Sequence, residues 1–289
     1  MILVTGATGK IGSEVVRLLA RAGVSARALV RDTAKTRTWS EIEIVKGDLD
    51  VPASVVAALH GVDTVFLLSV ANLEHELGVI EASKEAGVKK IVKLSGMGAD
   101  INSPLTITRR HGLSENRLIA SGLSWTILRP GYFTQNFLNF ATTIREQGKF
   151  FGSVKDGKIV PIDTRDIAEV AAATLTSSGH DGSTYVLTGT ETISYAEAAA
   201  KISSAIGKSV TYVDIPLEET RKGLEGSGFP QWLVEDFIIM EQSIASGRAV
   251  ILSKDFEKVT GHKPRVFDEF ARDYAASFQL ASGAAHPQQ

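Results

Sequence analysis

The segment 109–122 places two side chains that could do acid–base chemistry on one face of an expected helix. His111 and Glu115 are four residues apart, a spacing at which helical side chains are neighbours. An imidazole titrates near neutral pH and could move a proton, and a carboxylate could accept a hydrogen bond from a hydroxyl group. The same pair could instead be a solvated ion pair worth roughly a few tenths of a kcal/mol. The rest of the chain has to decide between these interpretations.

A glycine-rich loop near the N-terminus predicts a binding site for a pyrophosphate group. The sequence TGATGKIG sets Gly6, Gly9 and Gly12 between the first expected strand and the first expected helix. Glycine lets the backbone approach a phosphate closely, and a helix N-terminus offers it free amides and a positive dipole end. The spacing is one residue longer than the usual dinucleotide fingerprint, but the strand before it and the helix after it supply the expected context. Lys10 could reach a phosphate or remain solvated.

Charged residues after the second and third expected strands bear on which dinucleotide binds. In NAD-binding proteins an acidic residue at the end of the second strand holds the ribose hydroxyls. Here Arg31 occupies this region, with Lys35 nearby, and a guanidinium suits the 2′-phosphate of NADP(H). Asp32 keeps NAD(H) possible, and Arg31 could also be an ordinary surface arginine. Asp48, in the sequence GDL, could bind the adenine amino group or shape a turn. NADP(H) is therefore favoured over NAD(H).

Strand and helix signals alternate along the first half of the chain. The expected strands are 2–6, 24–30, 41–49, 62–68, 88–96 and 124–131, and the expected helices are 10–23, 52–61, 75–87 and 109–122. Most of these strands are nearly continuous apolar runs, as in sheets that are buried on both faces. The alternation predicts an α/β fold with a Rossmann-like, doubly wound parallel sheet.

The second half of the chain shows a looser pattern after Tyr132. We expect a helix at 133–148, a strand, turn and helix at 158–175, a strand at 183–189, a helix at 194–207, a strand at 209–216 and mostly helix at 217–278. Ser194 and Glu197 have the spacing of a capping box. We therefore expect a dinucleotide-binding domain at 1–150, to which 155–190 returns. A smaller, mostly helical substrate-binding lobe at 191–278 and a disordered tail at 279–289 follow.

Composition excludes several classes of function. The net charge is −2, so a basic footprint for nucleic acid is missing, and the absence of cysteine excludes disulfides and thiolate chemistry. The histidine of HEL at 75–77 lacks the second histidine of a zinc helix because Val79 stands there, and we predict no catalytic metal. No apolar run approaches a membrane span, and the chain begins directly with a strand. We expect a cytoplasmic monomer or homodimer that contacts neither nucleic acid nor membrane.

Six segments together resemble the NmrA-like group, an atypical branch of the short-chain dehydrogenase/reductase superfamily. They are TGATGKIG, VRDTAK, GDL, EAGVKKIVKLSG, GLSWTILRPGYF and DTRDIAEVAAATL. The resemblance extends to about residue 278. The group includes NADPH-dependent quinone reductases, triphenylmethane dye reductases and dinucleotide-sensing regulators, so the resemblance implies NADP(H) binding and a small aromatic substrate.

The resemblance also implies roles for individual residues. The matching pyrophosphate loop consists of Gly6, Thr8, Gly9, Lys10, Ile11 and Gly12. Arg31 matches the ligand of the 2′-phosphate, and Leu68 and Ser69 match the segment under the adenosine ribose. Ser95 stands at the end of the fifth strand, where typical members keep a catalytic serine. The matching loop beside the nicotinamide consists of Pro130, Gly131, Tyr132 and Phe133.

One departure from the superfamily pattern concerns the catalytic acid. Typical members carry Y-x-x-x-K after the fifth strand, whereas this sequence has His111 and Glu115 in that register, as the dye and quinone reductases of the group also do. None of the five tyrosines is followed by lysine four residues later. We expect Glu115 to accept a hydrogen bond from a ribose hydroxyl and His111 to orient the substrate or relay a proton. With Ser95 and Tyr132, His111 makes up the candidate catalytic set.

The missing tyrosine narrows the range of substrates. Hydride addition to a ketone creates an alkoxide that needs an acid, whereas a cationic dye becomes neutral and a quinone becomes a weakly basic hydroquinone anion. We therefore expect a reductase that uses NAD(P)H to transfer hydride to quinones or related electron-poor aromatic acceptors. The alternative is a non-catalytic NADP(H)-binding redox sensor. A nucleotide-sugar epimerase is disfavoured because its chemistry needs the tyrosine base.

Overall fold

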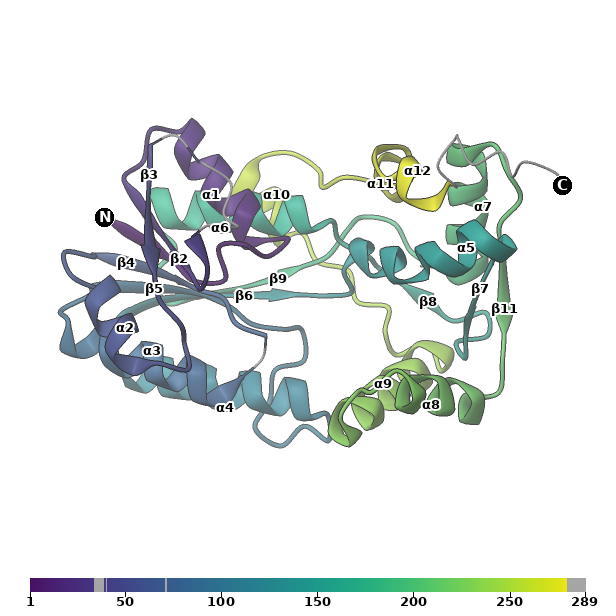
Figure 1. The fold of residues 1–289 in the computed structure, drawn as a ribbon, viewed down its shortest axis with the longest axis horizontal. Coiled ribbons are helices and arrows are strands. Elements are labelled where there is room, and N and C mark those ends of the chain that lie inside the picture. Colours follow the sequence, from purple (N-terminus) through teal and green to yellow (C-terminus); the bar gives the residue numbers. More distant parts are fainter. Residues whose placement is uncertain (34–38, 40, 71, 280–289) are drawn as a thin grey trace, which may run out of the picture. The chain divides into compact units, whose positions relative to one another are not determined.

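The computed structural model describes residues 1–33, 39, 41–70 and 72–279 of the chain (Figure 1). Lys35 and all but the first residue of the expected tail at 279–289 lie outside the described residues. Among the residues that the structure describes, every helix is too short or too polar to cross a membrane. In the same residues no cluster of three or more histidine, aspartate or glutamate side chains could hold a metal ion.

The described residues fall into two compact units that are each built from three chain segments. The first unit consists of 1–131, 164–187 and 253–263, and the second consists of 132–163, 188–252 and the described residues from 264 on. The expected domains differ in placing 132–150, 155–163 and 188–190 with the dinucleotide-binding domain. They also differ in placing 253–263, which belong to the first unit, with the smaller lobe. The segment 132–163 goes with the second unit because the strand formed by 149–152 pairs with 211–214, and because Phe137 and Phe150 lie in that unit's core.

The first unit is a parallel sheet with helices on both faces. In the described part of the chain its seven strands lie in the order β3-β2-β1-β4-β5-β6-β9. The strands are β1 (Ile2–Val4), β2 (Ala26–Val30), β3 (Ile42–Lys46), β4 (Thr64–Leu67), β5 (Lys90–Leu94), β6 (Ser124–Pro130) and β9 (Ser183–Leu187). Ile2 pairs with Ala26 on one side and with Thr64 on the other, so the chain order reverses at β1. The expected Rossmann-like, doubly wound fold is confirmed.

The helices of the first unit cover the sheet in two layers. They are α1 (Gly12–Arg21), α2 (Pro52–Ala58), α3 (Leu73–Glu85), α4 (Thr106–Ala120), α6 (Thr164–Thr176) and α10 (Asp255–Thr260). Figure 1 shows α1, α6 and α10 on one face of the sheet and α2, α3 and α4 on the other. The strands in the middle of the sheet are buried on both faces for this reason, and their apolar runs supply the core, whereas the edge strand β3 keeps Glu43 and Lys46 exposed.

The second unit is mostly helical and has an aromatic core. Its elements are the 3₁₀ helix η2 (Thr134–Phe140), α5 (Ala141–Gln147), β7 (Lys149–Gly152), β8 (Lys158–Ile159), β10 (Ile193–Ser194), α7 (Tyr195–Ile206), β11 (Thr211–Asp214), α8 (Leu217–Gly226), α9 (Gln231–Ala245), α11 (Phe267–Asp273) and α12 (Ala275–Phe278). The expected single helix at 133–148 is thus a 3₁₀ helix followed by an α-helix. The capping box of Ser194 and Glu197 is confirmed, with nitrogen–oxygen distances of 2.6 and 3.1 Å.

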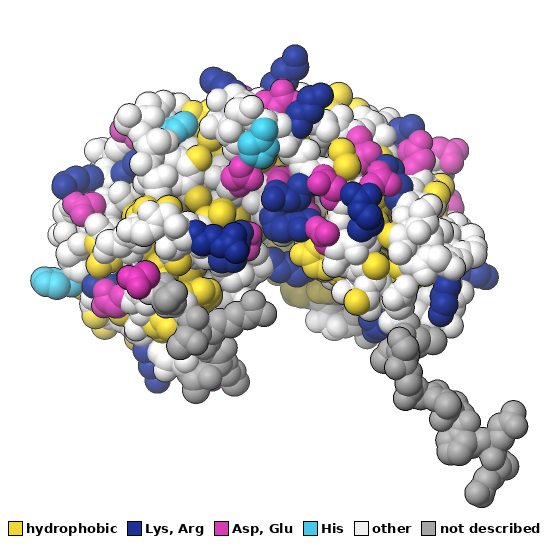
Figure 2. Space-filling view, turned by 90° about the horizontal axis from the view of Figure 1, so that it is seen from above, with side chains coloured by type: hydrophobic (Ala, Val, Ile, Leu, Met, Phe, Trp, Pro, Cys, Tyr) yellow, Lys and Arg dark blue, Asp and Glu magenta, His cyan; other side chains and the backbone are white. Residues whose placement is uncertain are grey.

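Charges of both signs are mixed over the molecular surface. On the face drawn in Figure 2, lysine and arginine side chains are interspersed with aspartate and glutamate side chains. This mixture agrees with the net charge of −2. The expectation that the protein does not bind nucleic acid stays a prediction.

Candidate active site

The glycine loop connects the end of β1 to the first turn of α1. Gly6, Thr8, Gly9 and Lys10 are exposed on it. A Cβ atom on Gly12 would lie 2.1 Å from the carbonyl oxygen of Gly6, so the close approach of loop and helix requires glycine at this position. Among the described residues no side chain caps the N-terminus of α1, where Ile11 is the N-cap residue. The exposed loop and the absence of a capping side chain at the start of the helix fit a pyrophosphate group.

Thr5 joins the glycine loop to the end of β4. Its hydroxyl donates a hydrogen bond to the carbonyl oxygen of Leu68 at 2.9 Å and accepts one from the Leu68 amide at 2.8 Å. These bonds hold the backbone at Leu68 and Ser69 beside the glycine loop, at the carboxyl edge of the sheet where such folds bind ligands. Thr5 is not among the site residues expected from the sequence, although a polar residue directly after an apolar strand is a signal for such a contact.

Arg31 and Asp48 lie at the carboxyl ends of β2 and β3. Arg31 is exposed, as a ligand of a 2′-phosphate has to be. The carboxylate of Asp48 accepts a hydrogen bond from the amide of Asp50 at 3.1 Å, and the Asp48 amide donates to the hydroxyl of Ser54 at 2.9 Å. Asp48 therefore shapes a turn in this structure, and its contact with adenine stays a prediction.

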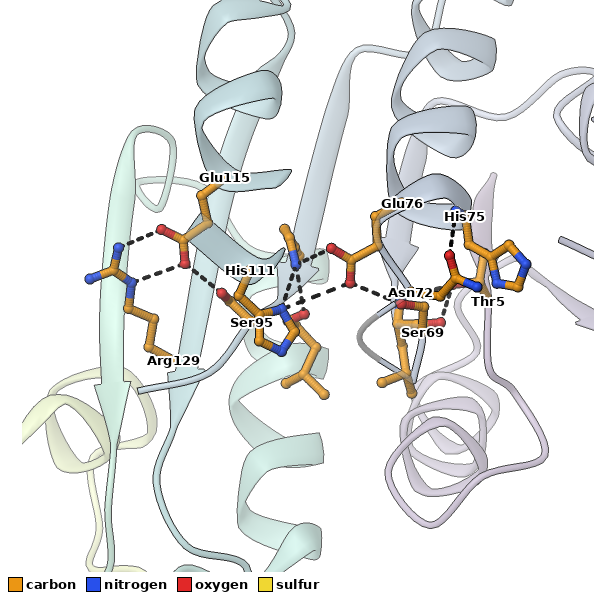
Figure 3. A network of polar contacts seen from close by, with 12 residues as sticks. Thr5, Ser69, Asn72, His75, Glu76, Ser95, His111, Glu115 and Arg129 are labelled. Carbon is orange, nitrogen blue, oxygen red and sulfur yellow. Dashed lines mark hydrogen bonds and ion pairs between the residues drawn. The ribbon is translucent and has the colours of Figure 1, made fainter. Parts of the chain in front are cut away.

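Figure 3 shows a network of polar side chains from α3, β5, α4 and β6 and from the residues that follow β1, β4 and β5. Lys93 of β5 is 0% exposed, and its Nζ atom lies 2.8 Å from Oε2 of Glu76 in α3. The same Nζ lies 3.3 Å from Nδ1 of His111. Oε1 of Glu76 accepts a hydrogen bond from the hydroxyl of Ser69 at 2.9 Å. A continuous polar chain therefore runs from the expected ribose segment to His111.

Glu115 has a different set of partners. Its carboxylate accepts a hydrogen bond from the Ser95 hydroxyl at 2.5 Å and one from Nε of Arg129 at 3.0 Å, and Nη2 of Arg129 also binds it. Glu115 is only 3% exposed and His111 only 7%. The interpretation of the two as a solvated ion pair is therefore wrong. A ribose hydroxyl would have to join the donors that already hold Glu115, so its expected cofactor contact stays a prediction.

Close packing of α4 sets the position of His111. A Cβ atom on Gly112 would lie 2.5 Å from the carbonyl carbon of Asp100, so the helix rests directly on the backbone of the loop that follows β5. The neighbouring His111 is thereby held at the end of β5, close to Gly96.

The electrostatics of the network keep His111 neutral. Burial lowers the pKa of His111 to about 4, helped by the charge of Lys93 and opposed by that of Glu76. Burial alone would raise the pKa of Glu76, but the charge of Lys93 and its hydrogen bond hold that pKa below its usual value. Burial lowers the pKa of Lys93, although the attraction of Glu76 opposes this shift. A paired carboxylate and ammonium beside a neutral imidazole is the arrangement that these directions support.

The backbone at the end of β6 closes on neighbouring segments. The amide of Gly131 donates a hydrogen bond to the carbonyl oxygen of Leu187 at 2.9 Å, and the amide of Met97 donates to that of Pro130, also at 2.9 Å. Pro130 and Gly131 therefore lie beside the loop that follows Ser95. Their expected contact with the nicotinamide stays a prediction.

Tyr132 and Phe133 begin the second unit. The Tyr132 hydroxyl lies 3.0 Å from the Tyr195 hydroxyl, and burial raises the pKa of Tyr132 to about 12. Phe133 forms a bridge with Ile162. Tyr132 packs against the aromatic core of this unit, around Phe137. A tyrosine with this pKa is a weak acid, and the catalytic role expected for Tyr132 stays a prediction.

Comparison with known proteins gives the family. The model of the NmrA-like family matches residues 1–271. The chain belongs to the NmrA-like family. This NmrA-like protein is 41% identical over 286 residues to the NAD(P)H azoreductase of Xenophilus azovorans, covering 97% of this chain and 100% of the relative. It is 32% identical over 271 residues to quinone oxidoreductase 2 of Escherichia coli (strain K12), and the match covers 91% of this chain and 94% of that protein. The crystal structure of an Escherichia coli NADPH-dependent quinone oxidoreductase complexed with NADPH superimposes with a TM-score of 0.84 at 31% identity. The match covers 94% of this chain and 99% of that chain.

Sequence reasoning missed Glu76, Lys93 and Arg129 in this NmrA-like protein. The signals were present, because Lys93 interrupts the apolar run of β5 and Arg129 interrupts that of β6. A lysine or arginine inside such a run implies a buried partner of opposite charge. Nothing in the sequence order indicates which carboxylate that partner is.

Proposed function

We propose that this protein is an NADPH-dependent reductase that transfers hydride to quinones, dyes and related electron-poor aromatic acceptors. The observation that carries the proposal is the state of His111 in the register of the usual tyrosine acid. It is buried and neutral, with a pKa of about 4. Such a group donates a hydrogen bond but is a poor proton donor, which suits acceptors that need no strong acid during hydride transfer. The full-length similarity to an azoreductase and a quinone oxidoreductase supports the same chemistry.

The residues of the first unit supply binding and orientation. The glycine loop and the N-terminus of α1 would hold the pyrophosphate, and Arg31 would bind the 2′-phosphate. NADPH, when bound, supplies the hydride. Ser95 and His111 present polar groups at the end of β5, on the edge of the sheet where ligands of this fold bind. Orientation of the acceptor and exclusion of water would then account for most of the rate enhancement.

The proposal can be tested by following NADPH oxidation at 340 nm with quinones, azo compounds, cationic triphenylmethane dyes and simple ketones. We expect turnover with the first three classes and none with ketones. Turnover of ketones at the same rate would contradict the role assigned to His111. Tight NADPH binding without turnover of any acceptor would contradict the reductase proposal and favour the redox sensor.

A further inference from the structure

The fully buried Lys93 has been described so far only as a charge that lowers the pKa of His111. It lies in β5 with 0% of its surface exposed, and its partner Glu76 is 1% exposed. Burying an ion pair is unfavourable unless geometry and hydrogen bonds compensate for lost solvation. An apolar pair of the same volume would stabilise this sheet at least as well. The role of the ammonium therefore lies in its effect on the groups around it.

The surroundings of the ammonium fix its hydrogen-bond pattern. In the described part of the chain, Nζ of Lys93 has three acceptors: Oε2 of Glu76 at 2.8 Å, the carbonyl oxygen of Leu94 at 3.1 Å and Nδ1 of His111 at 3.3 Å. An ammonium group has three N–H donors and no lone pair. Each donor is therefore matched by one acceptor, and Nδ1 of His111 has to be the unprotonated nitrogen of a neutral ring.

The other ring nitrogen of His111 then carries the proton. A Cβ atom on Gly96 would lie 3.1 Å from Cδ2 and 3.5 Å from Nε2 of His111, so this edge of the ring packs against Gly96, where a side chain would crowd it. Gly96 directly follows Ser95 at the carboxyl end of β5. The Nε2–H group thus lies at the edge of the sheet where ligands of this fold bind.

Charged groups around the ring support this tautomer. Oε1 of Glu76 is 3.9 Å from Nδ1, whereas Nζ of Lys93 is 3.3 Å from it, so the ammonium is the nearer charged group to this ring nitrogen. Glu115, one turn along α4, is engaged by Ser95 and Arg129. Within the described residues these are the charged groups that bear on the ring from α3, β5, α4 and β6.

We propose that Lys93 is a positioning residue that holds His111 as a neutral imidazole with its proton on Nε2, ready to donate a hydrogen bond to the acceptor atom that gains negative charge. The proposal rests on the reductase function and specifies how its site recognises the acceptor. A quinone that gains a hydride becomes a hydroquinone monoanion, the cofactor is oxidised, and a solvent proton completes the hydroquinone. The Nε2 proton stays on His111 throughout.

The tautomer can be read directly by ¹⁵N NMR of the full-length protein labelled at histidine, with His111→Gln used to assign the signal. We expect Nε2 to be protonated and Nδ1 unprotonated from pH 5.5 to pH 9. In Lys93→Met we expect the tautomer to reverse, because Nδ1–H would then donate to Glu76, and the pKa of His111 to rise. Lys90→Met is the matched control: this lysine lies in the same strand and pairs with Asp181 at 3.0 Å, and its loss should leave the His111 signals unchanged.

A double variant tests the same assignment without leaving an unpaired buried charge that could prevent folding. Lys93→Met leaves Glu76 as an unpaired buried charge, whereas Lys93→Met combined with Glu76→Gln removes both charges and keeps the volume. In the double variant, whose fold is checked by circular dichroism, we expect a mixture of tautomers. We also expect a roughly tenfold lower kcat/KM for quinone with unchanged NADPH affinity.

Two results would overturn the assignment: Nδ1 protonated in the wild type, or an unchanged Nε2–H tautomer in both Lys93 variants. The reductase function fails separately, because a wild type that reduces no acceptor but shows the expected tautomer refutes the activity and leaves the role of Lys93 toward His111 intact.

Discussion

At the scale of single residues, His111 is the group whose removal reports most directly on chemistry. Its Nε2 edge packs against Gly96 at the carboxyl end of β5, while Nδ1 lies 3.3 Å from Nζ of Lys93. We expect His111→Ala to lower kcat/KM for a quinone roughly tenfold, equivalent to about 1.4 kcal/mol, because one hydrogen bond to the reacting acceptor is lost. NADPH affinity should not change. His60→Ala removes an exposed histidine of the same unit and serves as the control. Steady-state kinetics indistinguishable from the wild type would exclude the role.

The buried state of His111 also predicts a dependence of stability on pH. Its pKa is about 4 in the folded protein and about 6.5 when unfolded. Below pH 6.5 His111 is protonated in the unfolded chain but stays neutral in the folded protein. The stability that is present above this pH is therefore lost as the pH falls toward 4. The loss by pH 4.5 should be roughly 2 to 3 kcal/mol. Urea unfolding measures the unfolding free energy at pH 7 and at pH 4.5. The decrease between the two pH values should be smaller in His111→Gln than in the wild type by this amount. Equal decreases in the two proteins would contradict the assignment.

Arg31 is the residue that we expect to select the cofactor. Charge-assisted hydrogen bonds to a 2′-phosphate contribute about 1.5–3 kcal/mol, so Arg31→Ala should weaken NADPH binding roughly ten- to a hundredfold. NADH binding should be almost unaffected, since that cofactor lacks the phosphate. Arg21→Ala, an exposed arginine at the end of α1, is the control. Titration calorimetry with both cofactors measures the ratio of the Kd for NADH to the Kd for NADPH. A ratio that is unchanged in Arg31→Ala would refute the assignment.

At the scale of elements, the contact between the glycine loop and α1 decides whether a pyrophosphate site exists. Because a Cβ atom at Gly12 would lie 2.1 Å from backbone, Gly12→Ala must displace the helix or the loop. We expect a loss of about 1–3 kcal/mol in unfolding free energy and a large loss of NADPH affinity.

Gly78 provides the matched control for that substitution. It lies inside α3, and a Cβ atom there meets nothing within 4 Å. Gly78→Ala should leave NADPH binding unchanged and stabilise the protein by up to about 1 kcal/mol. Urea unfolding and NADPH titration of both variants separate the two cases. Normal NADPH affinity in Gly12→Ala would show that the loop does not bind the cofactor as proposed.

At the scale of the whole molecule, NADPH should stabilise the folded chain because it binds only the assembled edge of the sheet. That edge is formed where β1, β2 and β4 end, and these strands come from separate parts of the sequence. At a concentration a hundred times its Kd, NADPH should raise the unfolding free energy by about 2.7 kcal/mol. NADH at the same concentration should raise it less. Chemical denaturation with each cofactor measures the difference, and equal stabilisation would argue against selection of NADPH.

The local pattern of residues was sufficient for much of the fold and for the cofactor loop. Apolar runs with glycine at the turns predict the alternation of strands and helices, since each signal is contained within one element. TGATGKIG places its glycines between a strand and a helix for the same reason. The capping box at Ser194 and Glu197 is local as well, and the structure confirms it. The domain to which 133–163 belongs could not be predicted in this way, because the partner of β7 is β11, about 60 residues away in sequence.

The partners of His111 and Glu115 depend on contacts between distant elements. Their four-residue spacing predicts that the two side chains interact with each other, yet each is bound by groups from other elements. Lys93 reaches His111 from β5 because the pleat of that strand turns its side chain inward, and Glu76 meets Lys93 because α3 packs over the same face of the sheet. Burial then changes the chemistry, since loss of solvent makes the imidazole neutral and keeps the ammonium and carboxylate paired. The sequence by itself determines which residue types are present. The tertiary structure decides their protonation states, because it determines which of these groups are close together and shielded from water.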